Sequence, residues 1–206
     1  MTELERLMWE VYEYVRGGGA RIYEGGANVA EATYLRDLAV SANALRVAEV
    51  GFNVGFSSIA FLESSPAVEV VSFELDCRPA VELAKQFIDQ RYPGRHHLVI
   101  GNSVETVPSY AEDHSSPFDL VFVDGGHEYE TARADIANAI RIAKPGALIV
   151  VDDVIPWHPW GVGPHQAWQD AMDSRLVEPV ELIVDGRVVE VIEEPGDRAW
   201  ATGRIR

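Results

Sequence analysis

Short apolar runs alternate with helix-like patterns along most of the chain. From Arg46 onward five runs predict buried strands, and helical or turn segments follow them: RVAEVG, VEVVSFE, HLVIG, FDLVFVDGG and ALIVVDD. Strands buried on both faces read as continuous apolar runs, so this order predicts a parallel sheet with helices on both faces. Strand patterns around Asp185-Gly186 and Pro195-Gly196 follow, and Asp-Gly is a strong hairpin signal. We predict an α/β fold, a Rossmann-like doubly wound sheet of seven mostly parallel strands with a C-terminal antiparallel hairpin.

The N-terminal segment predicts one amphipathic helix. Its apolar residues recur with helical spacing along one stripe, Leu4, Leu7, Met8, Val11, Tyr12 and Val15, and glycines 17 to 19 then end the helix. Residues 17–28 hold five glycines, which fits a hinge between two packed units or a lid near a ligand. Because sixteen preceding residues cannot form a domain, we predict a lid, extending to Tyr34. The whole chain, 1–206, is then one domain, with helix and lid in 1–34 and the core in 35–206.

Composition narrows the classes of partner. With 206 residues and 47% hydrophobic content, the chain can bury a core without disulfides or zinc. Its formal charge of −16 repels phosphate backbones and anionic lipids, so neither nucleic acid nor membrane is an expected partner. The sequence has a single cysteine, Cys77, and shows neither a signal peptide nor an apolar run long enough to span a membrane. These features indicate a cytoplasmic protein. Whether the protein forms a homodimer stays open.

A glycine-containing turn follows the first predicted strand. The segment reads Glu49-Val50-Gly51-Phe52-Asn53-Val54-Gly55-Phe56-Ser57-Ser58. Gly51 permits a tight backbone turn, Gly55 permits close approach of a ligand, and either serine can cap the next helix. A strand-to-helix turn without a ligand is the alternative. At the end of the second strand, Glu74 can accept hydrogen bonds from both hydroxyls of a ribose, which suits S-adenosylmethionine and NAD equally.

Carboxylates follow the fourth and fifth predicted strands. Asp124 ends one strand, and Asp152 and Asp153 end the next. If these strands are neighbours, the three acids converge at one edge of the sheet, where a divalent cation would relieve their repulsion, and Mg²⁺ prefers such oxygen ligands. Alternatively, one acid of the pair caps a helix or faces solvent. His127, three residues after Asp124, is a candidate general base or an ordinary loop histidine.

An aromatic segment follows these acids. Residues 156–168 read PWHPWGVGPHQAW, and this loop could form the wall of an acceptor pocket or a small satellite core. We leave open whether such a pocket is lined by Trp157, His158, Trp160 and His165.

The turn at residues 49–58 resembles motif I of class I S-adenosylmethionine-dependent methyltransferases, in the variant of the catechol-type and natural-product O-methyltransferases. The sequence lacks the central glycine of that motif, and Asp153 stands where the catechol branch has Asn. The resemblance extends from about residue 35 to the C-terminus. It implies an S-adenosylmethionine site with ribose contacts at Glu74 and adenine contacts near residues 101–104. Its cofactor-binding residues would be Glu49, Gly51, Asn53, Gly55, Ser57, Glu74, Leu75, Asn102, Ser103, Val104 and Asp124.

The same resemblance implies the chemistry at the acidic residues. Metal-dependent members carry an Asp after strand four and an acidic pair after strand five, which implies Mg²⁺ held by Asp124, Asp152 and Asp153. The D-G-x-H string is similar to an antibiotic-tailoring branch, in which a histidine here is a candidate general base, so His127 and Asp124 are the predicted catalytic residues. The expected reaction is O-methylation of a small-molecule hydroxyl. The alternatives are a non-catalytic S-adenosylmethionine-binding subunit, an NAD-dependent oxidoreductase, and N-methylation, for which no N-P-P-Y-like signature is present.

Overall fold

The computed structural model describes residues 1–22, 26–113 and 117–206. Internal contacts divide the chain into two compact units, Met1–Asn102 and Ser103–Arg206, which we describe separately. The single domain inferred from the sequence stays a prediction. Part of the predicted lid, residues 23–25, lies outside the described residues, and the lid's last six residues already belong to a helix.

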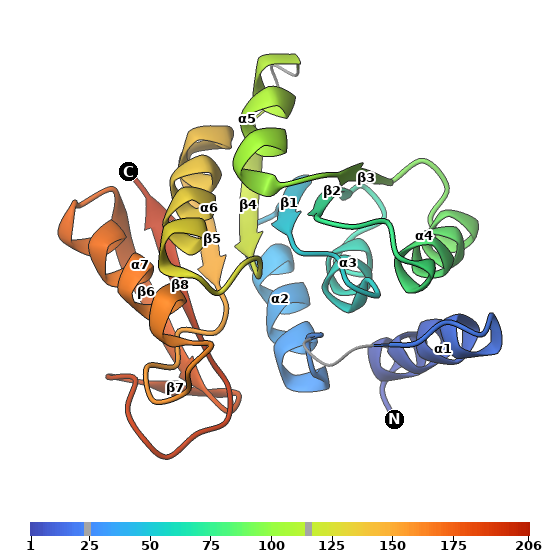
Figure 1. Ribbon diagram of the computed structural model, residues 1–206, viewed down its shortest axis with the longest axis horizontal. Coiled ribbons are helices and arrows are strands. Elements are labelled where there is room, and N and C mark those ends of the chain that lie inside the picture. Colours follow the sequence, from blue (N-terminus) through green and yellow to red (C-terminus); the bar gives the residue numbers. More distant parts are fainter. Residues whose placement is uncertain (23–25, 114–116) are drawn as a thin grey trace. The chain divides into compact units, whose positions relative to one another are not determined.

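Among its described residues, the first unit has a parallel three-stranded sheet and four helices (Figure 1). The strands lie in the order β3-β2-β1, with Val50 opposite Phe73 and Glu74 opposite Ile100 at their carboxyl ends. The elements are α1 (Glu3–Gly17), α2 (Val29–Ser41), β1 (Arg46–Val50), α3 (Phe56–Leu62), β2 (Glu69–Glu74), α4 (Pro79–Arg91) and β3 (His96–Ile100).

Helix α1 forms as its sequence pattern predicts. Thr2 and Glu5 make a capping box at its start, each side chain accepting the other residue's backbone N–H at 3.2 Å. It ends at Gly17, where the glycine run begins. The predicted stripe faces α3 and α4. Five of its six members are buried, Leu4, Leu7, Met8, Val11 and Val15, and Tyr12 is partly exposed. This helix is therefore packed into the first unit.

The second unit begins with a parallel strand pair and ends in antiparallel strands. Strand β4 runs parallel to β5, β5 pairs with β8, and β8 pairs with β6, which forms a hairpin with β7. Helices α6 and α7 pack side by side (Figure 1). The elements are α5 (Ser103–Asp113), β4 (Phe118–Val123), α6 (Tyr129–Ile142), β5 (Ala143–Val151), α7 (Val162–Asp173), β6 (Val177–Val184), β7 (Arg187–Val189) and β8 (Ala199–Ile205).

The turn between β6 and β7 is the hairpin that Asp185-Gly186 predicts. Both residues have positive φ, 48° and 75°, and Val184 pairs with Arg187 across the turn. The Asp185 carboxylate also accepts the backbone N–H groups of Asp197 and Arg198, each at 3.0 Å. The tip of this hairpin is therefore bonded to the chain segment that leads into β8.

The predicted α/β class, the mostly parallel strands and the C-terminal hairpin are confirmed. The described residues contain eight strands instead of the predicted seven, because the C-terminal segment forms three strands and one of them, β7, has only three residues. None of the helices described has the length and apolar character needed to cross a bilayer.

Candidate cofactor and metal sites

The loop between β1 and α3, residues 51–55, is a sharp turn that depends on two glycines. Gly51 and Gly55 have φ of +94° and +74°, and Asn53 between them has φ of +50°. A Cβ added at Gly55 would lie 2.6 Å from Ile88 Cδ1 and 2.9 Å from Phe52 Cε2. Both the backbone conformation and the surrounding space therefore require glycine at position 55. We call residues 51–55 the cofactor loop, after its predicted role.

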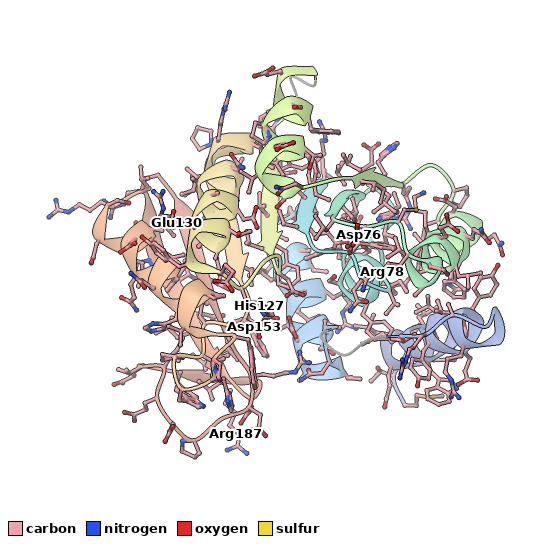
Figure 2. All side chains as sticks on the ribbon, in the orientation of Figure 1. Asp76, Arg78, His127, Glu130, Asp153 and Arg187 are labelled. Carbon is pink, nitrogen blue, oxygen red and sulfur yellow. The ribbon has the colours of Figure 1, made fainter. Side chains whose placement is uncertain are left out.

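Glu74 fastens the cofactor loop to the end of β2. Its Oε2 accepts the backbone N–H groups of Phe52 at 3.2 Å and Asn53 at 2.8 Å, and its Oε1 accepts that of Asp76 at 3.3 Å. Arg78 Nη2 lies 3.8 Å from Oε1; Asp76 and Arg78 are labelled in Figure 2. A carboxylate has about four acceptor positions, so three amide bonds leave capacity for a further donor. This fits the predicted bond to a ribose hydroxyl.

Glu49 lies in the interior beneath the loop, with no exposed surface. Its Oε1 accepts hydrogen bonds from the hydroxyls of Ser58 and Ser72. Burial raises the pKa of the Glu49 carboxyl to about 7. Ser57, in the first turn of α3, is also buried. The contacts in the structure give Glu49 a structural role, and a direct contact of Glu49 or Ser57 with a cofactor stays a prediction.

The other predicted cofactor residues lie at strand and helix ends. Leu75 directly follows β2, and 64% of its surface is exposed. Asn102 is an exposed residue at the end of the first unit, while Ser103 and Val104 begin α5 in the second unit. Leu75 and Val104 thus offer exposed apolar surface, as contact with a purine base requires. Their binding roles stay predictions.

Two acids and a histidine converge in the second unit. Ligand atoms of Asp124, His127 and Asp153 all lie within 4.8 Å of one another. Asp124 directly follows β4, and Asp153 stands two residues after β5, whose last residue is paired with that of β4, Val123 opposite Val151. His127 Nε2 is 2.9 Å from Asp153 Oδ2, and Figure 2 shows the two side chains next to each other. The predicted convergence of acids from the two strands is present for Asp124 and Asp153.

Asp152 lies beside this group but outside it. Its backbone N–H donates to Val123 O at 2.9 Å, so the strand pairing continues through Asp152. Asp153 then has φ of +56°, which ends the strand and changes the direction of the next side chain. Asp152 is buried and lines the same cavity as the other three residues, about 10 Å³ in volume. That volume suits one water molecule or one ion. Ligation by Asp152 stays a prediction.

This acidic cluster has two chemical uses. Two carboxylates and an imidazole fit a divalent cation, because carboxylates suit Mg²⁺ and imidazole is accepted by several transition metals. Without a cation, the Asp153 carboxylate raises the pKa of His127 through their hydrogen bond. The neutral form of His127 can accept a proton, and Asp153 stabilises the cation that results. The residues therefore suit activation of a hydroxyl group.

The aromatic segment divides into a fixed part and an exposed part. Trp157 Nε1 donates to Gly196 O at 2.9 Å, which ties this tryptophan to the chain before β8. His158 and Trp160 stack with ring centroids 4.4 Å apart and an interplanar angle of 6°, and Trp160 is exposed. His165 stands in α7, where burial lowers its pKa. The His158–Trp160 stack can offer a flat apolar surface, and its part in an acceptor pocket stays a prediction.

The structure also shows a buried acid that we did not select from the sequence. Asp135 in α6 has no exposed surface, and within the described chain no group makes a hydrogen bond of good geometry to its carboxylate. Ser103 and the backbone N–H of Gly126 lie near it, and burial raises its pKa to about 6. Asp135 shares the buried face of α6 with Ala132 and Ala139, so a polar residue on an apolar stripe was the signal in the sequence.

Comparison with known proteins identifies the family. A family model described as a methyltransferase domain matches residues 48–154, more than half of the chain. The chain belongs to this methyltransferase domain family. The matched region includes both the cofactor loop and the acidic cluster, and it confirms the family predicted from residues 49–58. Membership in this family argues against an NAD-dependent oxidoreductase.

Relatives of this methyltransferase-domain protein include two catechol O-methyltransferases. That of Mycobacterium tuberculosis is 38% identical over 120 residues, 57% of this chain and 52% of the relative. That of Niastella koreensis is 27% identical over 123 residues, 59% of this chain and 55% of the relative. The matches thus span about half of the length of these curated relatives.

Solved structures show the same fold over nearly the whole chain. Cofactor-bound Rv0187 from MTB has a TM-score of 0.81 at 25% identity, covering 98% of this chain and 90% of the other. The O-methyltransferase TomG from Streptomyces achromogenes, solved in complex with SAM, has a TM-score of 0.76 at 20% identity, covering 100% and 99%. The Rossmann-like methyltransferase fold is therefore confirmed.

Proposed function

We propose that this protein transfers a methyl group from S-adenosylmethionine to a hydroxyl of a small molecule. The observation that carries the proposal is the cluster of Asp124, His127 and Asp153 in a chain of the methyltransferase domain family. A carboxylate–imidazole cluster removes a proton from a hydroxyl, which O-methylation needs. The catechol O-methyltransferases among its relatives favour an acceptor with neighbouring hydroxyls.

We assign cofactor binding to the first unit. Bound S-adenosylmethionine would supply a methyl group on a sulfonium, which an oxygen nucleophile attacks in line. Glu74 would hold the ribose, and its bonds to the amides of Phe52 and Asn53 keep the loop in shape for close approach. The other proposed contacts in this unit are Glu49, Gly51, Asn53, Gly55, Ser57, Leu75 and Asn102. The resemblance also implies contacts at Ser103, Val104 and Asp124, which belong to the second unit.

We assign binding and deprotonation of the acceptor hydroxyl to the second unit. Asp124 and Asp153, with Asp152 as a proposed third ligand, would hold a divalent cation such as Mg²⁺, which would lower the pKa of a bound hydroxyl. His127 would take the proton on Nδ1, because its Nε2–H donates to Asp153 Oδ2. Asp153 thereby orients the imidazole and stabilises its charged form. The His158–Trp160 stack would exclude water beside an aromatic acceptor. The single exposed Cys77 fits the proposed reducing, cytoplasmic setting.

The test is methyl transfer to catechol with Mg²⁺, followed through formation of S-adenosylhomocysteine. We expect Asp124→Asn to lower turnover by about 100-fold or more, because the charged metal ligand is lost. The affinity for S-adenosylmethionine should change much less, because asparagine keeps an acceptor oxygen at the proposed cofactor contact. Glu130→Gln, at an exposed position near the start of α6, is the matched control and should leave turnover unchanged. If titration calorimetry detects no S-adenosylmethionine binding, the proposal is wrong. Binding without transfer to any hydroxyl acceptor in a panel would instead favour the non-catalytic alternative.

A further inference from the structure

A chain of buried polar side chains runs beneath the cofactor loop. Glu49 of β1, Ser58 of α3, Ser72 of β2 and His96 of β3 are all nearly or completely without exposed surface. Ser72 Oγ lies 2.5 Å from Glu49 Oε1 and 2.7 Å from His96 Nε2. Ser58 bonds to the same Glu49 oxygen. Four elements of the first unit are thus joined by one hydrogen-bond network, and His96 is its end member.

The proton count fixes the form of His96. When Glu49 is ionised, above its pKa of about 7, the Ser72 hydroxyl donates its single proton to Glu49 Oε1. Ser72 then accepts from His96, and the imidazole carries its proton on Nε2. Among the described residues no partner stands at Nδ1, which agrees with a bare lone pair there. Burial lowers the pKa of His96 to about 3, so the ring is neutral at pH 7.

The same ring also supports the cofactor loop directly. His96 stacks on Phe52 with ring centroids 5.2 Å apart and an interplanar angle of 30°. The backbone N–H of Phe52 is one of the two loop amides that Glu74 binds, and the Phe52 ring fills the space beside Gly55. A shift of the Phe52 ring would therefore move the amide that meets the Glu74 carboxylate.

We propose that His96 is a positioning residue for cofactor binding, which supports Phe52 with its ring and holds Glu49 in place through Ser72. The inference rests on the proposed function, because it takes residues 51–55 as the loop that binds S-adenosylmethionine. His96 itself is buried beneath the loop and acts through Phe52, Ser72 and Glu49, with no contact to a substrate.

Two variants separate the two contacts of His96. His96→Phe keeps a ring under Phe52 and loses the N–H donor, whereas His96→Gln keeps a donor and loses the ring. Each should weaken S-adenosylmethionine binding by about tenfold in titration calorimetry, since a buried partner is left unsatisfied or the loop loses its support. His97→Phe, at an exposed position on the same strand, is the matched control and should change the affinity less than about twofold. Unchanged affinity in both His96 variants would overturn the proposal, even if they are less stable.

A double variant tests the route through Ser72. If His96 acts on Glu49 through Ser72, His96→Phe should have little further effect on affinity in a Ser72→Ala background. Additive losses would contradict that route.

Nuclear magnetic resonance reports on the loop without the cofactor. Above pH 7, where Glu49 is ionised, the ¹⁵N spectrum of His96 should show a neutral ring protonated on Nε2, and a ring protonated on Nδ1 or on both nitrogens would contradict the inference. The amide signals of Phe52 and Asn53 should shift in both His96 variants and remain in place in His97→Phe. If wild-type protein binds no S-adenosylmethionine, the proposed function fails, while these amide shifts still decide whether His96 positions the loop.

Discussion

Replacing Glu74 by Gln tests whether one carboxylate holds the cofactor loop. The amide side chain keeps a single acceptor oxygen, which can face the amides of Phe52 and Asn53 or the amide of Asp76, but not both sets. The NH₂ group of the glutamine then faces the backbone N–H of the other set, and two donors cannot form a hydrogen bond. At least one bond to a charged acceptor is lost in either orientation, and two are lost if the oxygen faces Asp76.

The expected loss follows from this count. A hydrogen bond to a charged group contributes about 1.5 to 3 kcal/mol, so Glu74→Gln should lower the free energy of unfolding by about 2 to 4 kcal/mol. Glu82→Gln, at an exposed position on α4, removes the same charge without a loop contact and should cost less than about 0.5 kcal/mol.

Urea unfolding and calorimetric titration with S-adenosylmethionine measure the two consequences separately. In Glu74→Gln both stability and cofactor affinity should fall, because the loop is released and the proposed ribose acceptor is weakened. If this variant matches Glu82→Gln in both measurements, the carboxylate does not hold the loop and the reasoning from the three amide bonds is wrong.

Three further outcomes are expected. Gly55→Ala should lower the free energy of unfolding by about 2 to 4 kcal/mol, whereas Gly94→Ala, at a similar φ of +76° but with open space around it, should cost about 1 kcal/mol; equal losses would contradict the steric argument. Because burial raises the pKa of Glu49 from 4.5 to about 7, the folded chain binds this proton more tightly, so the Glu49 contribution to stability should fall by up to about 3 kcal/mol as pH rises across that window. Glu49→Gln should remove this dependence in a urea series from pH 4.5 to 8. Asp153→Asn should lower the pKa of His127 in an NMR titration, and an unchanged value would show that the 2.9 Å contact does not form in solution.

The sequence pattern was sufficient to predict where the strands lie, but it was less informative about which residues form the acidic cluster. Apolar runs located β1 to β5, and Asp185-Gly186 located the hairpin, because local periodicity and turn chemistry act within a few residues. The direction of a side chain just past a strand end depends on backbone angles that the sequence does not display. The positive φ of Asp153 is such a case. Asp153 belongs to the group with Asp124 and His127, while Asp152 lies beside it.

The role of His96 had no local signal in the sequence. Its neighbours in the chain are ordinary strand residues, and its partners Ser72 and Glu49 belong to other strands. Only the pairing register, which puts β2 between β1 and β3, brings these three side chains together. Contacts across strands of this kind depend on tertiary structure, and a single sequence does not reveal them.

The bonds of the Asp185 carboxylate have a practical consequence for engineering. A hairpin tip is usually the first choice for inserting an epitope or a fluorescent label, since such turns tolerate extra residues. Here an insertion after Asp185 would displace the acceptor that holds the amides of Asp197 and Arg198, and would release the segment entering β8.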